Sequence, residues 1–260
     1  MENVRTFKTT AKILQQATEL TDLPIIIASH STLQDQGIII HPTPDNPIYR
    51  IFYYSKLDEE ETNAAVTHEL CHIIRTLRVP EEERLAVRMQ PVIQHFKTYR
   101  TIGTSLFSYP DDIEIEKFIA NCSDLKSGQR KLWRPVIGGF KREIEDDFRT
   151  LPQGLFLVKH SLDYVLMRRV GELIGEKATR HYYGYADVMQ EGNELLEIAD
   201  GVKREDIVGD REVSRLWIER LGIGEVFSLI PQAVAEFADG DLEFLLETNP
   251  NVEVSVSGDN

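Results

Sequence analysis

The segment at residues 57–77, LDEEETNAAVTHELCHIIRTL, constrains the fold most, because its pattern is that of one long capped helix. Asp58 is a good N-cap, and Glu61 three residues later completes a capping box. The acids of the first turn complement the positive end of the helix dipole. Apolar side chains recur along one stripe, at Val66, Leu70, Ile73, Ile74 and Leu77. We therefore predict a helix that packs one face on a core and ends before Pro80.

Short strands precede this helix, and further helices follow it. Residues 5–20 have helical spacing, and the runs LPIIIASH, GIII and YRIFYY, set between glycines and prolines, predict the strands of a small sheet. After Pro80 we predict helices over 81–99, 111–125, 140–149, 155–176, 184–199, 211–221 and 224–238. The predicted fold class is α+β, with a small N-terminal sheet, a helix that carries an HExxH motif, and a mostly helical C-terminal half.

The polar stretch SDLKSGQRKLW, near residues 123–133, is the best candidate for a boundary between two parts of the chain. We predict one unit over 1–125 and a helical continuation over 126–246 that packs on the cleft of the first unit. The last residues, 247–260, are polar and predict a frayed tail.

Composition and charge argue against several functional classes. No apolar run approaches the length of about 18 residues that a membrane helix needs, and the N-terminus lacks the apolar region of a secretory signal. The net charge of −14 opposes direct nucleic-acid binding. The two cysteines, Cys71 and Cys122, suggest no disulfide framework. We expect a cytoplasmic protein without membrane or nucleic-acid partners; the sequence indicates no oligomeric state.

The predicted helix carries the motif THELCHI, in which His68 and His72 are four residues apart. Residues i and i+4 lie on the same face of a helix, so both imidazoles can bind one ion. Glu69 is rotated by about 100° from His68, at the edge of such a site. There its carboxylate can take a proton from a zinc-bound water, whose pKa the metal lowers. The motif therefore predicts a zinc site with Glu69 as general base.

A catalytic zinc needs a third protein ligand, and the acids of SYPDDIEIEKFIANC are the candidates. In a helix that begins near Asp111, Glu114 borders the buried side, while Glu116 and Asp111 remain alternatives. Acids in the first turn of a helix are also stabilising without any metal. Three weaker candidates are the histidines His95, His160 and His181.

These features together resemble the compact gluzincin metallopeptidases, and most closely the ImmA/IrrE-like group. The stretch EIEKFIA is similar to the segment that carries the third ligand in that group, and it matches at Glu114, Phe118 and Ala120. The resemblance covers residues 1–125. It implies a zincin-like fold, zinc held by His68, His72 and Glu114, and Glu69 as base. It also implies that YRIFYY is an edge strand to which an extended peptide substrate adds.

We therefore expect a zinc-dependent metallopeptidase that hydrolyses a peptide or protein substrate. One alternative is a non-catalytic regulatory or partner-binding protein with a structural or vestigial metal site, and another is a metal hydrolase of small amides. Cys71 stands where the resembled family often has glycine, and we predict a packed thiol there. The cluster His181–Tyr185 either donates a hydrogen bond to an oxyanion or, as we favour, packs around a helix end.

Overall fold

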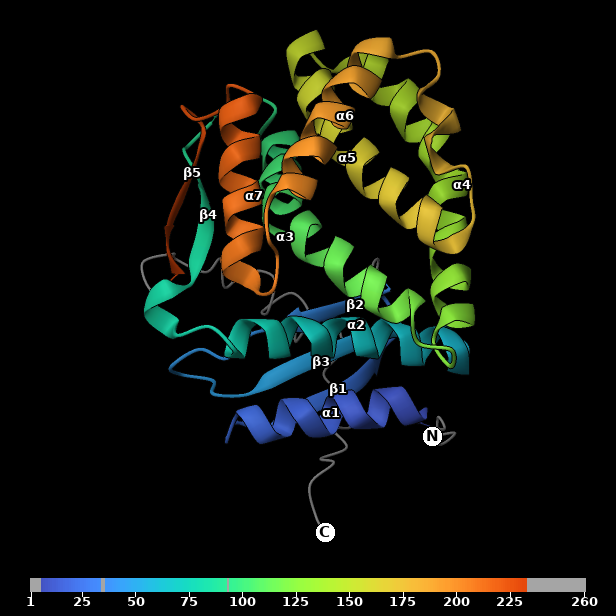
Figure 1. Cartoon of the computed structure of the whole chain (residues 1–260), viewed down its shortest axis with the longest axis vertical. Helices are drawn as coiled ribbons and strands as arrows, with labels where there is room; N and C mark the ends of the chain where they lie inside the picture. The colour runs from blue at the N-terminus through green and yellow to red at the C-terminus, as the bar shows by residue number, and fades with distance from the viewer. Residues whose placement is uncertain (1–5, 34–35, 93, 233–260) are drawn as a thin grey trace. The chain divides into compact units, whose positions relative to one another are not determined.

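The structure, a computed structural model, describes residues 6–33, 36–92 and 94–232 (Figure 1). These residues form two compact units that are interleaved in the sequence. The first contains the described residues up to Arg78 together with Phe118–Leu132, and the second contains Val79–Lys117 and the described residues from Trp133 on. The sequence predicts a single boundary instead. The predicted tail, 247–260, lies outside the described residues.

The first unit contains the N-terminal sheet and the predicted long helix, and it confirms the α+β class. Its elements are α1 (Lys8–Leu20), β1 (Ile25–His30), β2 (Gly37–Ile40), β3 (Tyr49–Tyr54) and α2 (Glu59–Leu77). The end of α3 (Phe96–Ala120) and the start of α4 (Lys126–Thr150) also belong to this unit. The strand order is β1-β3-β2, with β1 parallel and β2 antiparallel to β3. Ile51 of β3 pairs with Ile27 on one side and with Ile39 on the other.

β3 is the central strand of this sheet, so the prediction that YRIFYY is an edge strand is wrong. Both edges of β3 are hydrogen-bonded to neighbouring strands, which leaves no row of backbone groups for a peptide. The sequence carried a signal for this, because the successive residues Ile51 and Phe52 are both apolar and point to opposite faces of the strand. Both side chains are buried in the structure. A strand with apolar side chains on both faces is typical of the interior of a sheet. In the described sheet the outer strands are β1 and β2.

The helix α2 forms as predicted, with its capping box complete. The Asp58 carboxylate accepts the Glu61 backbone N–H at 2.9 Å, and the Glu61 carboxylate accepts the Asp58 N–H at 2.8 Å. α2 packs on β2 and β3, and α1 packs along α2 (Figure 1). The hydroxyls of Thr10 and Thr67 lie 2.9 Å apart between the two helices. Polar and apolar contacts therefore hold α2 against both the sheet and α1.

The start of α4 (Lys126–Thr150) lies against the N-terminus of α2. The Lys131 ammonium pairs with the carboxylates of Asp58 and Glu60 at 2.6 and 2.5 Å. Gly128 allows this approach, since a Cβ there would lie 2.0 Å from the Glu60 carbonyl oxygen. These contacts join the segment Phe118–Leu132 to the first unit, although the 39 residues Val79–Lys117 of the other unit separate the two parts in sequence.

The second unit is a helical assembly with a two-stranded sheet. Its remaining elements are β4 (Leu85–Met89), α3 (Phe96–Ala120), α5 (Gln153–Ile174), α6 (Ala186–Gly201), α7 (Ile207–Arg220) and β5 (Phe227–Pro231), with short 3-10 turns at Glu81–Glu83 and Ala178–Tyr182. α6 packs on both α5 and α7, and α7 packs on the strand pair (Figure 1). Trp217 is fully buried, and its indole N–H donates to the Leu195 carbonyl at 2.9 Å. No helix in the described ranges is long and apolar enough to cross a bilayer.

Two predicted helices of this unit are wrong. The N-terminal part of 81–99 forms β4, and the described part of 224–238 forms β5. β4 and β5 pair antiparallel, with Val87 opposite Leu229, so each strand obtains its hydrogen bonds from a partner more than 130 residues away. Residues 233–238 lie outside the described part of the chain. The predicted start of a helix near Asp111 is also wrong, because α3 begins at Phe96 and continues through Pro110.

Replacing the N-cap tests the anchoring of α2. We expect Asp58→Ala to lower the free energy of unfolding by about 1 kcal/mol, because the Glu61 N–H then loses its acceptor. The hydrogen bond from Lys131 holds the pKa of Asp58 below its ordinary value, so this contribution is present above that ordinary value and is lost as the pH falls through the lowered pKa. Urea unfolding at neutral pH measures the difference. Asp58→Asn, which keeps a capping side chain, should cost less than the alanine variant; an equal cost would contradict the capping role.

Candidate metal centre

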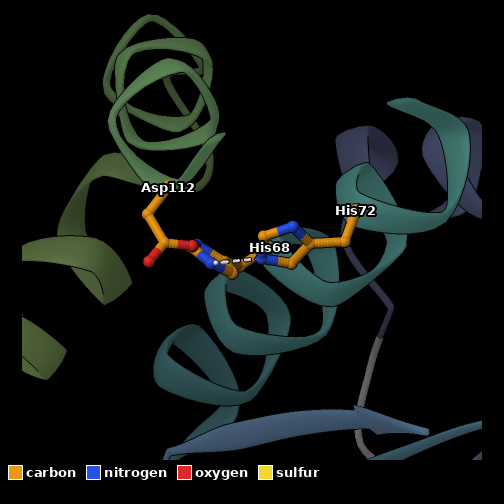
Figure 2. A group of neighbouring side chains, drawn as sticks. All are labelled: His68, His72 and Asp112. Atoms are coloured by element: carbon orange, nitrogen blue, oxygen red, sulfur yellow. Dashed lines mark hydrogen bonds between the residues drawn. The ribbon is translucent and has the colours of Figure 1, made fainter. Parts of the chain in front are cut away.

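The two histidines of the motif point at one another from successive turns of α2. Their Nε2 atoms lie 3.1 Å apart, and the two rings are inclined at 69° (Figure 2). Two imidazole nitrogens that each lie about 2.0–2.1 Å from a tetrahedral zinc ion are roughly 3.3 Å apart. The observed spacing is therefore close to that of a pair of ligands on one ion, and the rings converge as the helical spacing predicts.

The same two histidines stand out in the burial of α2. Between Thr62 and Ile74 every residue is buried except His68 and His72, which are partly exposed. The predicted apolar stripe is buried from Val66 to Ile74, and Leu77 is partly buried. Cys71 is buried and is not part of a disulfide, in agreement with the predicted packed thiol. α2 is thus held by the surrounding structure on almost every side.

Glu69 lies between the histidines in sequence, but its side chain points toward the outer strand β2. It is 8% exposed. A Cβ on Gly37, the first residue of β2, would lie 3.1 Å from Glu69 Oε1 and 3.3 Å from its Cγ. The absence of a side chain at Gly37 therefore leaves the space that the Glu69 carboxylate occupies. This contact places a carboxylate beside the backbone of a sheet edge.

The candidate third ligands lie on α3 and have different surroundings. Glu114 forms ion pairs with Lys117 at 2.8 Å and with Arg204 at 2.6 Å. Asp111 and Glu116 are buried, whereas Asp112 is partly exposed. Asp112 and Glu116 are one helical turn apart on the same face, and Glu114 lies on another. The sequence reasoning does not select Asp112, because it chose the acid that borders the predicted buried side.

The weaker histidine candidates lie in the second unit. His95 is exposed and has a positive φ of 55°. His160 is fully buried on α5, and its Nε2 lies 3.0 Å from the Asp147 carboxylate of α4. His181 belongs to the predicted cluster, in which the Tyr182 ring is fully buried while Tyr183 is 70% exposed. The Tyr182 ring packs against Phe140, His160 and Tyr164.

Comparisons with known proteins add no assignment. No protein-family model matches the sequence, and neither a curated protein nor a solved structure matches the chain. The chemistry of the candidate centre therefore has to be argued from its own side chains.

The polar cluster around the buried His160 gives a prediction about pH. Its members are the Lys159 ammonium, the carboxylates of Glu143, Asp147 and Asp163, and the Tyr109 hydroxyl, which donates to Asp163 at 2.8 Å. Burial, and then the charge of Lys159, lower the pKa of His160 below its ordinary value of 6.5, against the pull of the two aspartates. The unfolded chain therefore binds more protons between the lowered pKa and 6.5, so stability rises with pH across that range.

We expect His160→Gln to flatten this rise, measured as the urea unfolding midpoint between pH 5 and pH 7.5. The matched control is His95→Gln, an exposed histidine of the same unit, which should leave the parental slope. Equal slopes in the parent and in His160→Gln would show that His160 does not contribute to the pH dependence.

Proposed function

We propose that the protein is a metal-dependent peptidase whose metal is held by His68 and His72. One observation carries the proposal: two imidazoles with convergent Nε2 atoms stand on a buried helix, and the glutamate between them points at the backbone of an outer strand. Two histidines that only pack against the structure would not need a carboxylate in this position, so the position of Glu69 favours metal binding. The resemblance to the ImmA/IrrE-like metallopeptidases supports the same function.

Asp112 is our preferred third ligand. His68, His72 and Asp112 are the set of imidazole and carboxylate side chains, within the described ranges, that could hold a metal ion. Glu114, the acid that the family resemblance implies, is engaged by two cations, and the Arg204 side chain that binds it is only 5% exposed. Removing one partner of a buried ion pair is costly, so Glu114 would bind a metal only at the expense of this pairing.

Two imidazoles and one carboxylate form a ligand set that suits zinc. When bound, zinc supplies Lewis-acid chemistry: it lowers the pKa of a water and polarises the carbonyl of a peptide bond. Glu69 is the residue of this chain that moves the proton. Its carboxylate accepts a proton from the attacking water and passes it to the leaving nitrogen of the peptide. The low exposure of Glu69 keeps its carboxylate oriented by neighbouring groups.

The outer strand β2 provides a surface for the substrate. Because Glu69 Oε1 lies beside Gly37, a peptide aligned with β2 would run next to the general base. We propose that an extended peptide adds to β2 by main-chain hydrogen bonds. This replaces the role that the sequence assigned to Tyr49–Tyr54, whose two edges are already paired.

Metal analysis of variants tests the ligand set. We expect about one zinc per parent chain, and we expect His72→Ala to lose it, because a single imidazole and a carboxylate bind zinc weakly. Asp112→Asn should weaken zinc binding, whereas Glu114→Gln should retain it. Inductively coupled plasma mass spectrometry of dialysed protein gives the stoichiometry.

The paired α3 variants separate the two candidate acids. Loss of zinc in Glu114→Gln with retention in Asp112→Asn would assign the third ligand to Glu114 and contradict our choice. If His72→Ala bound zinc as well as the parent does, the metal site itself would be disproved. Circular dichroism of each variant checks that the helices remain.

Catalysis is tested by Glu69→Gln. We expect this variant to keep its zinc and to lose hydrolysis of a quenched fluorescent peptide library by about 10²-fold or more, because the amide cannot accept the proton. Glu59→Gln, an exposed glutamate in the first turn of the same helix, is the matched control and should keep the parental rate. Parental cleavage by Glu69→Gln would contradict the mechanism. A zinc-binding parent without peptide hydrolysis would favour a non-catalytic role or another substrate.

A further inference from the structure

The helix α3 contains a proline that leaves one of its buried carbonyl groups without the usual partner. Pro110 has no N–H, so the carbonyl of Leu106, four residues earlier, cannot form its helical hydrogen bond. Leu106 is fully buried. A buried carbonyl without a partner costs free energy, and a proline inside a helix bends or opens it. The direction of α3 beyond Pro110 therefore depends on what binds the carbonyls around this residue.

Side chains of the stretch 204–214 bind three of these carbonyls. The buried Ser214 hydroxyl donates to the Leu106 oxygen at 2.6 Å, closer than the 3.0 Å to Asp210 O of its own helix. The Arg211 guanidinium donates to the Phe107 oxygen and stacks on the Phe107 ring, with Cζ 3.8 Å from the ring centroid.

Arg204 completes the set on the C-terminal side of the proline. It donates to the Pro110 oxygen at 3.4 Å. We name Arg204, Arg211 and Ser214 the α7 clamp. It joins α7 and Arg204, three residues before α7, to the part of α3 on either side of Pro110.

The residues that follow Pro110 are the candidate metal ligands of α3. Asp111 and Asp112 come directly after Pro110, and Glu114 is within the next turn. Arg204 binds the Pro110 carbonyl and the Glu114 carboxylate at once, so it contacts both ends of this acidic turn. The ion pair with Arg204 neutralises Glu114, while Asp112 lies on another face of the helix.

We propose that the α7 clamp consists of positioning residues, which fix the acidic turn of α3 and thereby set metal affinity. The inference rests on the proposed function, since it assumes that Asp112 is a ligand. The clamp touches neither metal nor substrate. It acts by supplying a donor to the Leu106 carbonyl that Pro110 leaves without a helical partner and by binding the neighbouring carbonyls of Phe107 and Pro110. Through Arg204 it also keeps Glu114 from competing as a ligand. Groups that orient metal ligands commonly change affinity by about 10- to 100-fold when they are removed.

Two clamp variants test this role through zinc affinity and hydrogen exchange. We expect Ser214→Ala and Arg204→Gln to bind about one zinc per chain, about tenfold or more weakly than the parent in a competition titration with a chromophoric chelator. Amides 111–116 should exchange faster in both variants without metal, because the α3 turn loses its support. The cobalt-substituted proteins should show altered visible absorption, which reports on ligand geometry.

The matched control is Arg215→Gln, next to Ser214 on α7. Arg215 pairs with Glu212 and Glu219 of its own helix on the exposed face, so its loss should leave affinity, exchange and spectrum unchanged. Arg204→Lys, which keeps the charge, should recover part of the affinity that Arg204→Gln loses. If Arg204→Gln fails to fold, Ser214→Ala decides the question, because it removes only one oxygen atom.

Parental zinc affinity in Ser214→Ala, with faster amide exchange in α3, would overturn the positioning role and leave the clamp purely structural. That result would not affect the proposed function, because zinc would still be bound and would still be lost in His72→Ala. A parent that binds no zinc would overturn the proposed function, and the positioning role with it.

Discussion

The regular spacing of side chains on a buried helix is the constraint on which the candidate centre depends. His68 and His72 face one another because α2 is a continuous helix, and it is continuous because its first turn is capped and its other faces are packed. The rotation of about 100° between neighbouring residues then directs Glu69 away from the imidazoles, toward β2. One local geometry therefore supplies the candidate ligand pair and separates the proposed base from it. The sheet and α1 contribute by keeping this helix in place.

In α3, by contrast, a backbone carbonyl lacks its helical donor, and residues distant in the sequence supply one. The proline removes a backbone donor, and the second unit supplies side-chain donors from α7 and from Arg204, three residues before it. The acidic turn after Pro110 also has a defined surrounding of charges, in which Glu114 is paired with Lys117 and Arg204 while Asp112 is partly exposed.

Local signals predicted α2 well, because its cap, its acidic first turn and its apolar stripe lie within about twenty residues of one another. Local signals did not predict β4 and β5, because each short strand is stabilised by a partner more than 130 residues away. Their apolar patterns also fit a helix as readily as a strand. The edge assignment of β3 came from a family resemblance and failed. The sequence of the strand itself pointed the other way, because Ile51 and Phe52 are both apolar and lie on opposite faces, and both are buried in the structure. The choice among the α3 acids depended on Arg204, a contact about ninety residues distant that no spacing rule reveals.

The interleaving of the two units has a consequence for biosynthesis. Thr9, at the start of α1, is bound through its backbone and side chain by the carboxylate of Asp124, and Gln36 donates to the carbonyl of Leu132. A nascent chain that has emerged only as far as Arg78 holds the whole sheet and both of its helices, but none of these ties. The N-terminal unit therefore cannot reach its final packing until the ribosome has released the 39 intervening residues and the beginning of α4. The folding of this unit is therefore delayed by the order in which its segments are synthesised, in addition to the slow formation of contacts between residues distant in sequence.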